Sequence, residues 1–227
     1  MLSCTIGRVG SLAAPSVTVP RTRPLQSKYV LFFVYGLLGL VVLYTRDLAL
    51  LDSASPLRQR YTNIPWLMLA HGVFGALALI LGVFQFSSRL RSRYLAVHRL
   101  FGRIYIGSVF IAAPVAVVVA VILGPPVLVM AASIQAGGWI LCTAVALYCV
   151  RHGNIQQHRQ WMMRGYPFAM VFVVVRAVLA IPAVQRLGEV GFVSTVWGVI
   201  ALACFVPSVV IAWQTTFPRK AAAQTAR

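Results

Sequence analysis

Acidic side chains are what this sequence has least of. Its 227 residues include three Asp and Glu against 20 Lys and Arg, so the formal net charge is +17. Charged residues make up only 10% of the chain and hydrophobic residues 60%, whereas a soluble domain carries about 25% charged residues. The mean hydropathy is +0.85. This composition excludes a soluble globular domain, and it also excludes a disordered chain, which needs low hydrophobicity.

The shortage of acids also counts against several enzyme classes. Zinc-dependent hydrolysis requires three protein ligands and an activating base, and although His98, His152 and His158 could cluster, no Asp or Glu is predicted beside them. Ser–His–Asp catalysis lacks its acid for the same reason. Neither a glycine-rich phosphate loop nor a CxxC or zinc-ligand spacing of the four cysteines is present. A hydrolase or transferase is therefore disfavoured, whereas a redox component stays open.

Long apolar runs are what the sequence has instead. About 20 apolar residues in helical form cross a hydrocarbon core of about 30 Å. Six such spans are predicted, at 29–45, 64–86, 102–123, 126–150, 165–185 and 191–213. The predicted fold is therefore all-α, a polytopic transmembrane helix bundle with six spans. It occupies one domain at 29–213, between a flexible basic N-terminal tail at 1–28 and a basic cytoplasmic tail at 214–227.

The distribution of basic residues predicts the orientation. The two tails and the segments 87–103 and 151–164 together carry 15 Lys and Arg, and the opposite loops carry four. Because basic loops stay in the cytoplasm, both termini are predicted to be cytoplasmic. The expected partners are the lipid bilayer and its anionic headgroups, with no nucleic acid. The predicted location is the cell (inner) membrane, and the acid-free N-terminal tail keeps a mitochondrial membrane as the alternative.

Three polar side chains are predicted to lie inside the hydrocarbon. His71, Gln135 and Arg176 fall about 10 to 13 Å from the outer ends of their spans, and Pro114 falls at a similar depth. Ionisable groups at such depths are costly and mark functional sites. One hypothesis is a ligand pocket made by the three side chains, for a carboxylate, a haem propionate or a quinone oxygen. The alternative is that Arg176 snorkels to the surface or bonds backbone carbonyls.

Two further histidines open spans from the predicted cytoplasmic side. Each is followed by two arginines, in the order His98, Arg99, Arg103 and His158, Arg159, Arg164. One hypothesis makes the two imidazoles the axial ligands of one haem b iron, and the arginines the contacts of its propionates, because the guanidinium fork suits carboxylates. The alternative is a collar that binds lipid phosphates.

These residues belong to two blocks that resemble a known membrane family. The first block is His71-Gly72, Gly82-Val83-Phe84-Gln85-Phe86, Arg89, Arg91, His98-Arg99, Gly102-Arg103 and Tyr105, and the second is His158-Arg159, Trp161-Met162, Arg164 and Arg176. Over roughly residues 64–180 they resemble the family of domain of unknown function 2306 (DUF2306). That resemblance implies a multi-pass membrane protein and no established reaction.

In outline the layout is also similar to six-helix cytochromes of the b561 type, which hold haem between imidazoles on neighbouring helices. The chain departs from a two-haem pattern, because His71 has no second histidine in the outer half and Met130 would be a substitute ligand at best. The similarity therefore implies at most one well-formed haem.

Three functions follow as hypotheses. The first is a b-type haem-binding electron-transfer protein with a redox partner. The second is the binding or transport of an anionic or quinone-like amphiphile. The third is a non-catalytic membrane subunit or scaffold, for which small-residue helix faces and an arginine collar suffice. An absorption spectrum distinguishes the first, and ligand binding that depends on Arg176 distinguishes the second.

Overall fold

The computed structural model describes residues 27–216, and every regular element in that range is a helix. The long helices are α1 (Ser27–Val42), α3 (Pro65–Gln85), α5 (Leu95–Leu123), α6 (Pro126–Arg151), α7 (Ile155–Leu179) and α9 (Gly188–Thr216). The short ones are η1 (Leu43–Asp47), η2 (Leu48–Leu50), α2 (Pro56–Arg60), α4 (Ser88–Arg93) and α8 (Pro182–Gln185). The all-α prediction is confirmed.

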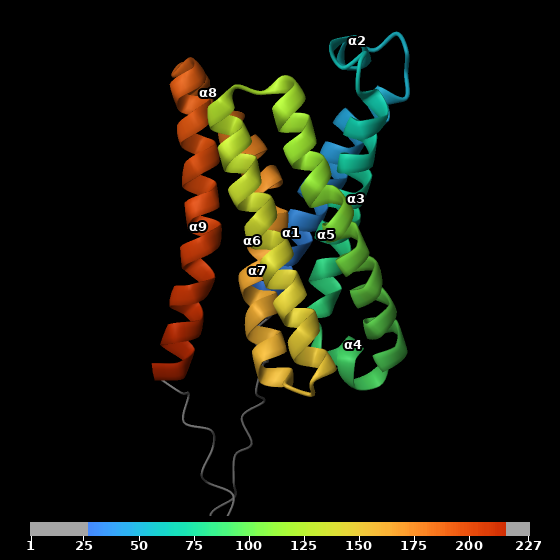
Figure 1. The fold of residues 1–227 in the computed structure, drawn as a ribbon, viewed down its shortest axis with the longest axis vertical. Helices are drawn as coiled ribbons and strands as arrows, with labels where there is room; N and C mark the ends of the chain where they lie inside the picture. Colours follow the sequence, from blue (N-terminus) through green and yellow to red (C-terminus); the bar gives the residue numbers. More distant parts are fainter. Residues whose placement is uncertain (1–26, 217–227) are drawn as a thin grey trace, which may run out of the picture.

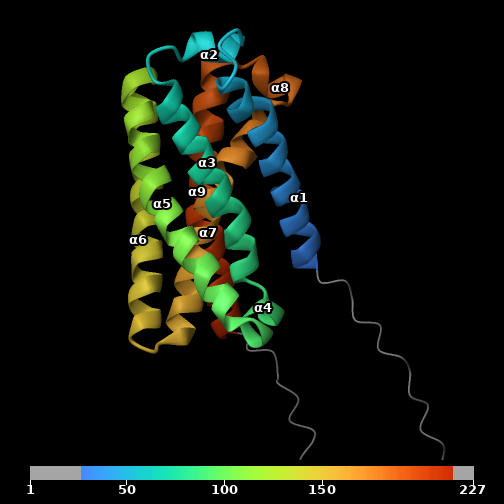
Figure 2. The ribbon, with the colours of Figure 1, turned by 90° about the vertical axis from the view of Figure 1, so that its right-hand side faces the viewer.

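The long helices run side by side and alternate in direction (Figures 1 and 2). Helices α3, α5, α6 and α7 form the core of the bundle: α3 and α6 each pack against both α5 and α7. Helix α1 lies against α3 and α7, and α9 lies against α7 and α6. We call the end that holds α4 and the turn between α6 and α7 the α4 end, and the opposite end the α2 end. Helix α1 begins, and α9 ends, toward the α4 end (Figure 2).

Five of these helices are long and apolar enough to cross a membrane: α3, α5, α6, α7 and α9. The predicted span at 29–45 corresponds to α1, whose 16 residues cover about 24 Å, less than a hydrocarbon core of about 30 Å. A π-helical turn, η1, follows it. Six spans, and the side on which the two ends lie, therefore stay predictions.

The boundaries of two predicted spans are wrong. Helix α5 begins at Leu95 rather than at 102, and α7 covers Ile155–Leu179 rather than 165–185. In both cases the arginine-bearing segment before the apolar run is helical too, so the helix is longer than its hydrophobic stretch. Helix α7 ends early because Pro182 begins the separate helix α8, and a residue before proline avoids the helical conformation.

Local sequence signals explain where several helices begin. Pro65 and Pro126 occupy the first turn of α3 and α6, where the missing N–H costs nothing. The α6–α7 turn contains Gly153 at φ 74°, a left-handed conformation that glycine adopts without a steric penalty. Asn154 then caps α7, because its side chain accepts a hydrogen bond from the Gln157 N–H at 3.1 Å.

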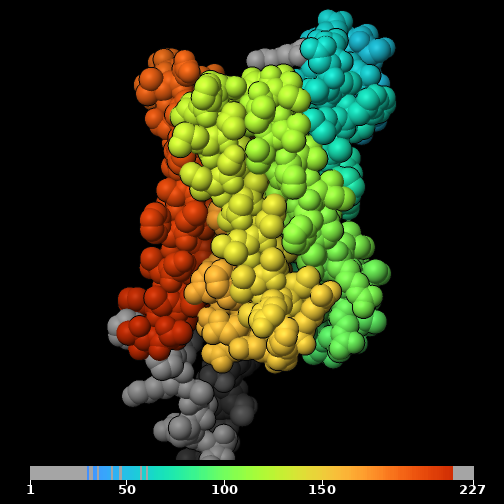
Figure 3. All heavy atoms as spheres, in the orientation of Figure 1, coloured from blue at the N-terminus to red at the C-terminus, as the bar shows by residue number. Residues whose placement is uncertain are grey.

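Large apolar side chains cover the outside of the bundle. Phe33 on α1, Val121 on α5 and Phe205 on α9 are 71%, 61% and 69% exposed. In the view of Figure 3, α6 lies between α5 and α9, and the side chains of α5, α6 and α7 close over the core. Apolar surface of this extent would be unfavourable in water, so the bundle contacts the lipid bilayer.

A layer of aromatic side chains fills the middle of the bundle. We call Tyr105, Trp139 and Tyr166 the aromatic layer; they are 1%, 5% and 3% exposed. Trp139 Nε1–H donates to the Tyr105 hydroxyl at 3.1 Å, and the Tyr166 hydroxyl donates to the Leu79 carbonyl at 2.9 Å. Gly82 makes room for the layer, because a Cβ there would collide with the Tyr166 ring. The layer is therefore tightly packed and its polar atoms are hydrogen-bonded.

Candidate functional site

Two cavities lie on either side of the aromatic layer. The larger, about 630 Å³, lies toward the α4 end; we call it the His158 cavity. The smaller, about 420 Å³, lies toward the α2 end; we call it the Arg176 cavity. The two cavities share no lining residue. Tyr166 separates them. Its hydroxyl donates to the carbonyl of Leu79, which lines the Arg176 cavity, and its ring centroid lies 5.3 Å from that of Phe86, which lines the His158 cavity.

The His158 cavity brings together most of the residues of the haem hypothesis. Five of the six predicted residues line it, and they are His98, Arg99, Arg103, His158 and Arg159. The rest of its lining is mainly apolar and includes Leu95, Ile106, Leu147, Val150, Ile155, Met162 and Met163. None of the described residues that line it is Asp or Glu. The arrangement therefore combines two imidazoles and several guanidinium groups with an apolar slot.

His158 is held in a defined orientation. Its Nδ1–H donates to the Ala146 carbonyl oxygen at 2.8 Å, and since that oxygen only accepts, the neutral ring carries its proton on Nδ1 and its lone pair on Nε2. Metal-binding histidines are commonly oriented in this way, by a carbonyl that accepts from the other ring nitrogen. This hydrogen bond leaves Nε2 as the ring atom whose lone pair can bond another group.

His98 lies within electrostatic reach of His158 but is less constrained. Its Nδ1 is buried and has no hydrogen-bond partner among residues 27–216, and the same holds for Gln85 Nε2 on the same cavity. Buried polar atoms normally have a partner. Both atoms therefore have hydrogen-bonding capacity left for a ligand.

Arg164 and His152 lie elsewhere. Arg164 does not line the cavity; its guanidinium carbon lies 5.0 Å from the centre of the Trp161 ring. The predicted role of Arg164 as a propionate contact is therefore not supported by its position. His152 Nδ1–H donates to the Tyr148 carbonyl at 2.9 Å on the surface. Within the described part of the chain, no three His, Cys, Asp or Glu side chains come close enough to hold a metal ion.

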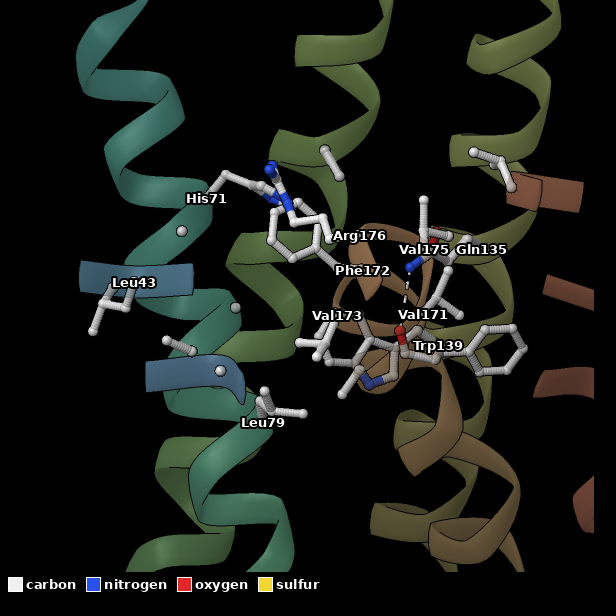
Figure 4. A pocket seen from close by; sticks show the side chains of 18 of the residues that line it. Leu43, His71, Leu79, Gln135, Trp139, Val171, Phe172, Val173, Val175 and Arg176 are labelled. Carbon is white, nitrogen blue, oxygen red and sulfur yellow. Dashed lines mark hydrogen bonds between the residues drawn. The ribbon is translucent and has the colours of Figure 1, made fainter. Parts of the chain in front are cut away.

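The Arg176 cavity brings together all three residues of the predicted ligand pocket. His71 comes from α3, Gln135 from α6 and Arg176 from α7 (Figure 4). The Arg176 guanidinium carbon lies 4.1 Å from the centre of the Phe172 ring, and His71 meets the same ring edge-on at 6.0 Å between centroids. Phe172 thus contacts both the imidazole and the cation at the cavity wall.

Two of the polar side chains also bond the backbone of neighbouring helices. His71 Nδ1–H donates to the Ala112 carbonyl at 3.1 Å, and Gln135 Nε2–H donates to the Phe168 carbonyl at 3.2 Å. Pro114, predicted at this depth, deprives the Phe110 carbonyl of its helical donor, so the carbonyl that His71 uses is a different one. Met130, the substitute ligand considered from the sequence, is 61% exposed and lines neither cavity.

Sequence reasoning missed several cavity residues. Arg91, Arg151 and Gln85 line the His158 cavity, and Tyr61 and Trp139 line the Arg176 cavity. The two arginines belong to the basic segments that set the predicted orientation, so their presence near the α4 end was foreseeable. Their direction toward the cavity was not, because it depends on how each helix is rotated against its neighbours.

Comparison with known proteins agrees with the membrane architecture. The sequence pattern of the family described as "Predicted membrane protein (DUF2306)" matches residues 68–216. The match extends beyond the blocks recognised in the sequence and includes α9. No curated protein and no solved structure matches the chain. With five apolar helices that can cross a bilayer and a match over more than half of its length, the chain belongs to the DUF2306 family of predicted membrane proteins.

Proposed function

We propose that the His158 cavity binds one haem b and that the protein carries electrons within the membrane. The observation that carries the proposal is the pair of histidines in one cavity. His98 comes from α5 and His158 from α7, two helices that lie on opposite sides of the core because each packs against α3 and α6. A haem bound in this cavity would be held by His98 and His158.

The set of donors favours haem over a simple metal ion. A structural zinc site needs four protein ligands and a catalytic one needs three, whereas the residues that the structure describes here offer two imidazoles and no carboxylate. Haem brings its own ring nitrogens and takes only axial ligands from the protein. The cavity volume of about 630 Å³ is within the usual range for cofactor sites, about 300 to 1,000 Å³.

The chain's own residues would divide the work. His158, oriented by the Ala146 carbonyl, and His98 would hold the iron. Arg99, Arg103 and Arg159 would bind the propionates, since guanidinium groups form charge-assisted hydrogen bonds with carboxylates. The apolar wall would exclude water and would favour ferrous over ferric iron, because the ferrous ion carries less charge. When bound, the haem would supply reversible one-electron chemistry.

The aromatic layer supports electron transfer over solute transport. A solute moving between the two cavities would have to displace Tyr105, Trp139 and Tyr166, which are buried and hydrogen-bonded. Electron transfer across the layer needs no such displacement of side chains. The competing explanation for the arginines is that they bind lipid phosphates, because a cluster of guanidinium groups recognises phosphates as well as carboxylates.

An absorption spectrum tests the proposal. The full chain is produced in haem-replete cells, purified in detergent, and measured with dithionite reduction against the oxidised state. A sharp reduced α-band, a shift of the Soret band and about one haem per chain are expected. If the folded protein gives a flat spectrum, and added hemin produces no saturable Soret change, the proposal is wrong.

A further inference from the structure

We infer that the Arg176 cavity binds the head group of a quinol or quinone. This cavity is separate from the proposed haem site, with the aromatic layer between them. The inference rests on three features of the cavity itself: its hydrogen-bonding groups, its aromatic wall, and its place between the core and the flanking helices. It would give the proposed electron carrier a redox partner dissolved in the membrane.

The hydrogen-bonding groups call for a ligand that both donates and accepts. His71 has used its Nδ1–H on the Ala112 carbonyl, so its neutral ring turns an acceptor, Nε2, toward other partners. Gln135 has used an amide N–H on the Phe168 carbonyl, and its side-chain oxygen can still accept. Arg176 contributes donors only. A ligand with an O–H and a neighbouring acceptor oxygen matches this set, because it can donate to one of the two acceptors and accept from Arg176.

A carboxylate does not match this set as well as a hydroxyl does. It would accept from Arg176, but it has no proton to donate to His71 Nε2 or to the Gln135 oxygen. A hydroquinone oxygen can donate its proton to one of these acceptors and accept from Arg176 at the same time. The oxidised quinone keeps the carbonyl that Arg176 recognises, so both redox forms would have a contact in the cavity.

The wall of the cavity suits a flat, neutral ring. Trp139, Phe168 and Phe172 line it from α6 and α7, and aromatic side chains pack well against a planar ring. On the α3 side, a Cβ built on Gly75 meets no heavy atom within 4 Å, so the space there is open. Figure 4 shows His71 and Arg176 on one side of this space, with Gln135 and Trp139 across from them.

The cavity also reaches helices that face the lipid. Its lining includes Gly39 and Leu43 from the segment of α1 and η1, and Phe192 and Val196 from α9. These helices flank the four-helix core, so a ring in the cavity lies next to the boundary with lipid. An apolar tail attached to the ring would remain in hydrocarbon, as in membrane quinones.

Binding of a short-tailed ubiquinone analogue to the full chain in lipid nanodiscs tests the inference. Equilibrium dialysis should show saturable binding to the native protein. Gly75→Phe fills the open space and keeps every polar group, so binding should weaken at least about tenfold. Gly137→Phe is the matched control, because a Cβ built on Gly137 also meets no heavy atom within 4 Å, but Gly137 is exposed and lies outside both cavities. The affinity of this variant for the quinone analogue should stay within about twofold of the native value.

Arg176→Leu should also lose about tenfold or more in affinity, the usual effect of removing a hydrogen bond from a charged donor. It provides a second variant if Gly75→Phe does not fold.

Two further arms separate this inference from the haem proposal and from an anion site. The same dialysis on His158→Ala protein should give unchanged quinone binding even when no haem is present. Dodecanoate is measured in parallel as a simple amphiphilic carboxylate. No saturable quinone binding by folded native protein, or equal binding by Gly75→Phe, would overturn the inference. Tighter binding of dodecanoate than of the quinone, lost in Arg176→Leu, would also overturn it and assign the cavity to anions.

Discussion

The two cavities differ in how the membrane constrains them. The His158 cavity lies at an end of the bundle and has two histidines and five arginines on its wall. The Arg176 cavity has one arginine, which lies over the Phe172 ring, and one histidine, which donates to the Ala112 carbonyl. Near the interface, charged side chains are inexpensive and can be numerous. Deeper in the bundle each one is costly and is accompanied by specific contacts.

This difference also separates what each cavity can bind. A cluster of guanidinium groups at the interface suits a ligand with carboxylates or phosphates, such as haem. A single cation among aromatic rings suits a neutral ring with polar edges. The aromatic layer keeps the two environments apart. The following experiments break or sharpen this comparison, beginning with the all-or-none outcomes.

The first prediction concerns the side of the membrane on which each cavity lies. The α4 end, with the arginine-rich starts of α5 and α7, is expected to face the cytoplasm. Reporter fusions that are active only in the cytoplasm should therefore be active at both chain ends and inactive when inserted into the loop between α5 and α6. An inactive C-terminal fusion of a folded protein would contradict the predicted orientation.

The second prediction separates the histidines. His98→Ala and His158→Ala should each remove nearly all bound haem, because each removes one of the two imidazoles that would hold the iron. His71→Ala should keep the haem content of the native protein, because His71 lines the other cavity. The measurement is haem per chain in the pyridine haemochrome assay. Full haem content in both His98→Ala and His158→Ala would refute the ligand assignment.

The third prediction compares two glycines on the same helix. Gly82 lies under the aromatic layer, where a Cβ would collide with the Tyr166 ring, and Gly75 faces open space in the Arg176 cavity. Gly82→Ala should lower the free energy of unfolding by about 1 to 3 kcal/mol, the usual cost of overpacking a core. Gly75→Ala should leave it unchanged or raise it by up to about 1 kcal/mol, since alanine favours a helix.

Denaturant unfolding of both variants in the same detergent measures this difference. The Gly75 variant serves as the control for the change of residue type. Equal stability of the two variants would show that the aromatic layer yields easily, and the separation of the two cavities would lose its structural basis.

The fourth prediction distinguishes two arginines that are equivalent in the sequence. Arg103 lines the His158 cavity, whereas Arg164 lies over the Trp161 ring outside it. Removing a positive charge beside a haem favours the ferric form, so Arg103→Gln should lower the midpoint potential by about 20 to 60 mV, given that 59 mV is tenfold for one electron. Arg164→Gln should shift it less. A potentiometric titration of both variants checks the order, and the reverse order would place Arg164 at the haem.

Several features of the fold could be predicted because they depend on one helix at a time. The long apolar runs indicated membrane-spanning helices, and five of them form helices that are long and apolar enough to cross a membrane. The depths of His71 and Gln135 followed from the rise of a helix. That of Arg176 did not, because α7 ends at Leu179 and Arg176 lies in its last turn. The structure nevertheless brings the three together in one cavity. What failed were the starts of α5 and α7, because hydrophobicity reports the apolar part of a helix and not where its hydrogen bonding begins.

The sequence by itself determined that this chain lies in a membrane as a bundle of helices, because the length and polarity of each segment decide that locally. Only the tertiary structure decided which arginines face a cavity, that Met130 faces outward, and that Tyr166 separates two cavities. These outcomes depend on contacts between distant segments, such as the hydrogen bond from Tyr166 to Leu79, 87 residues away. Side-chain packing sets the rotation of each helix against its neighbours, and that rotation assigns every side chain to the lipid, the core or a cavity.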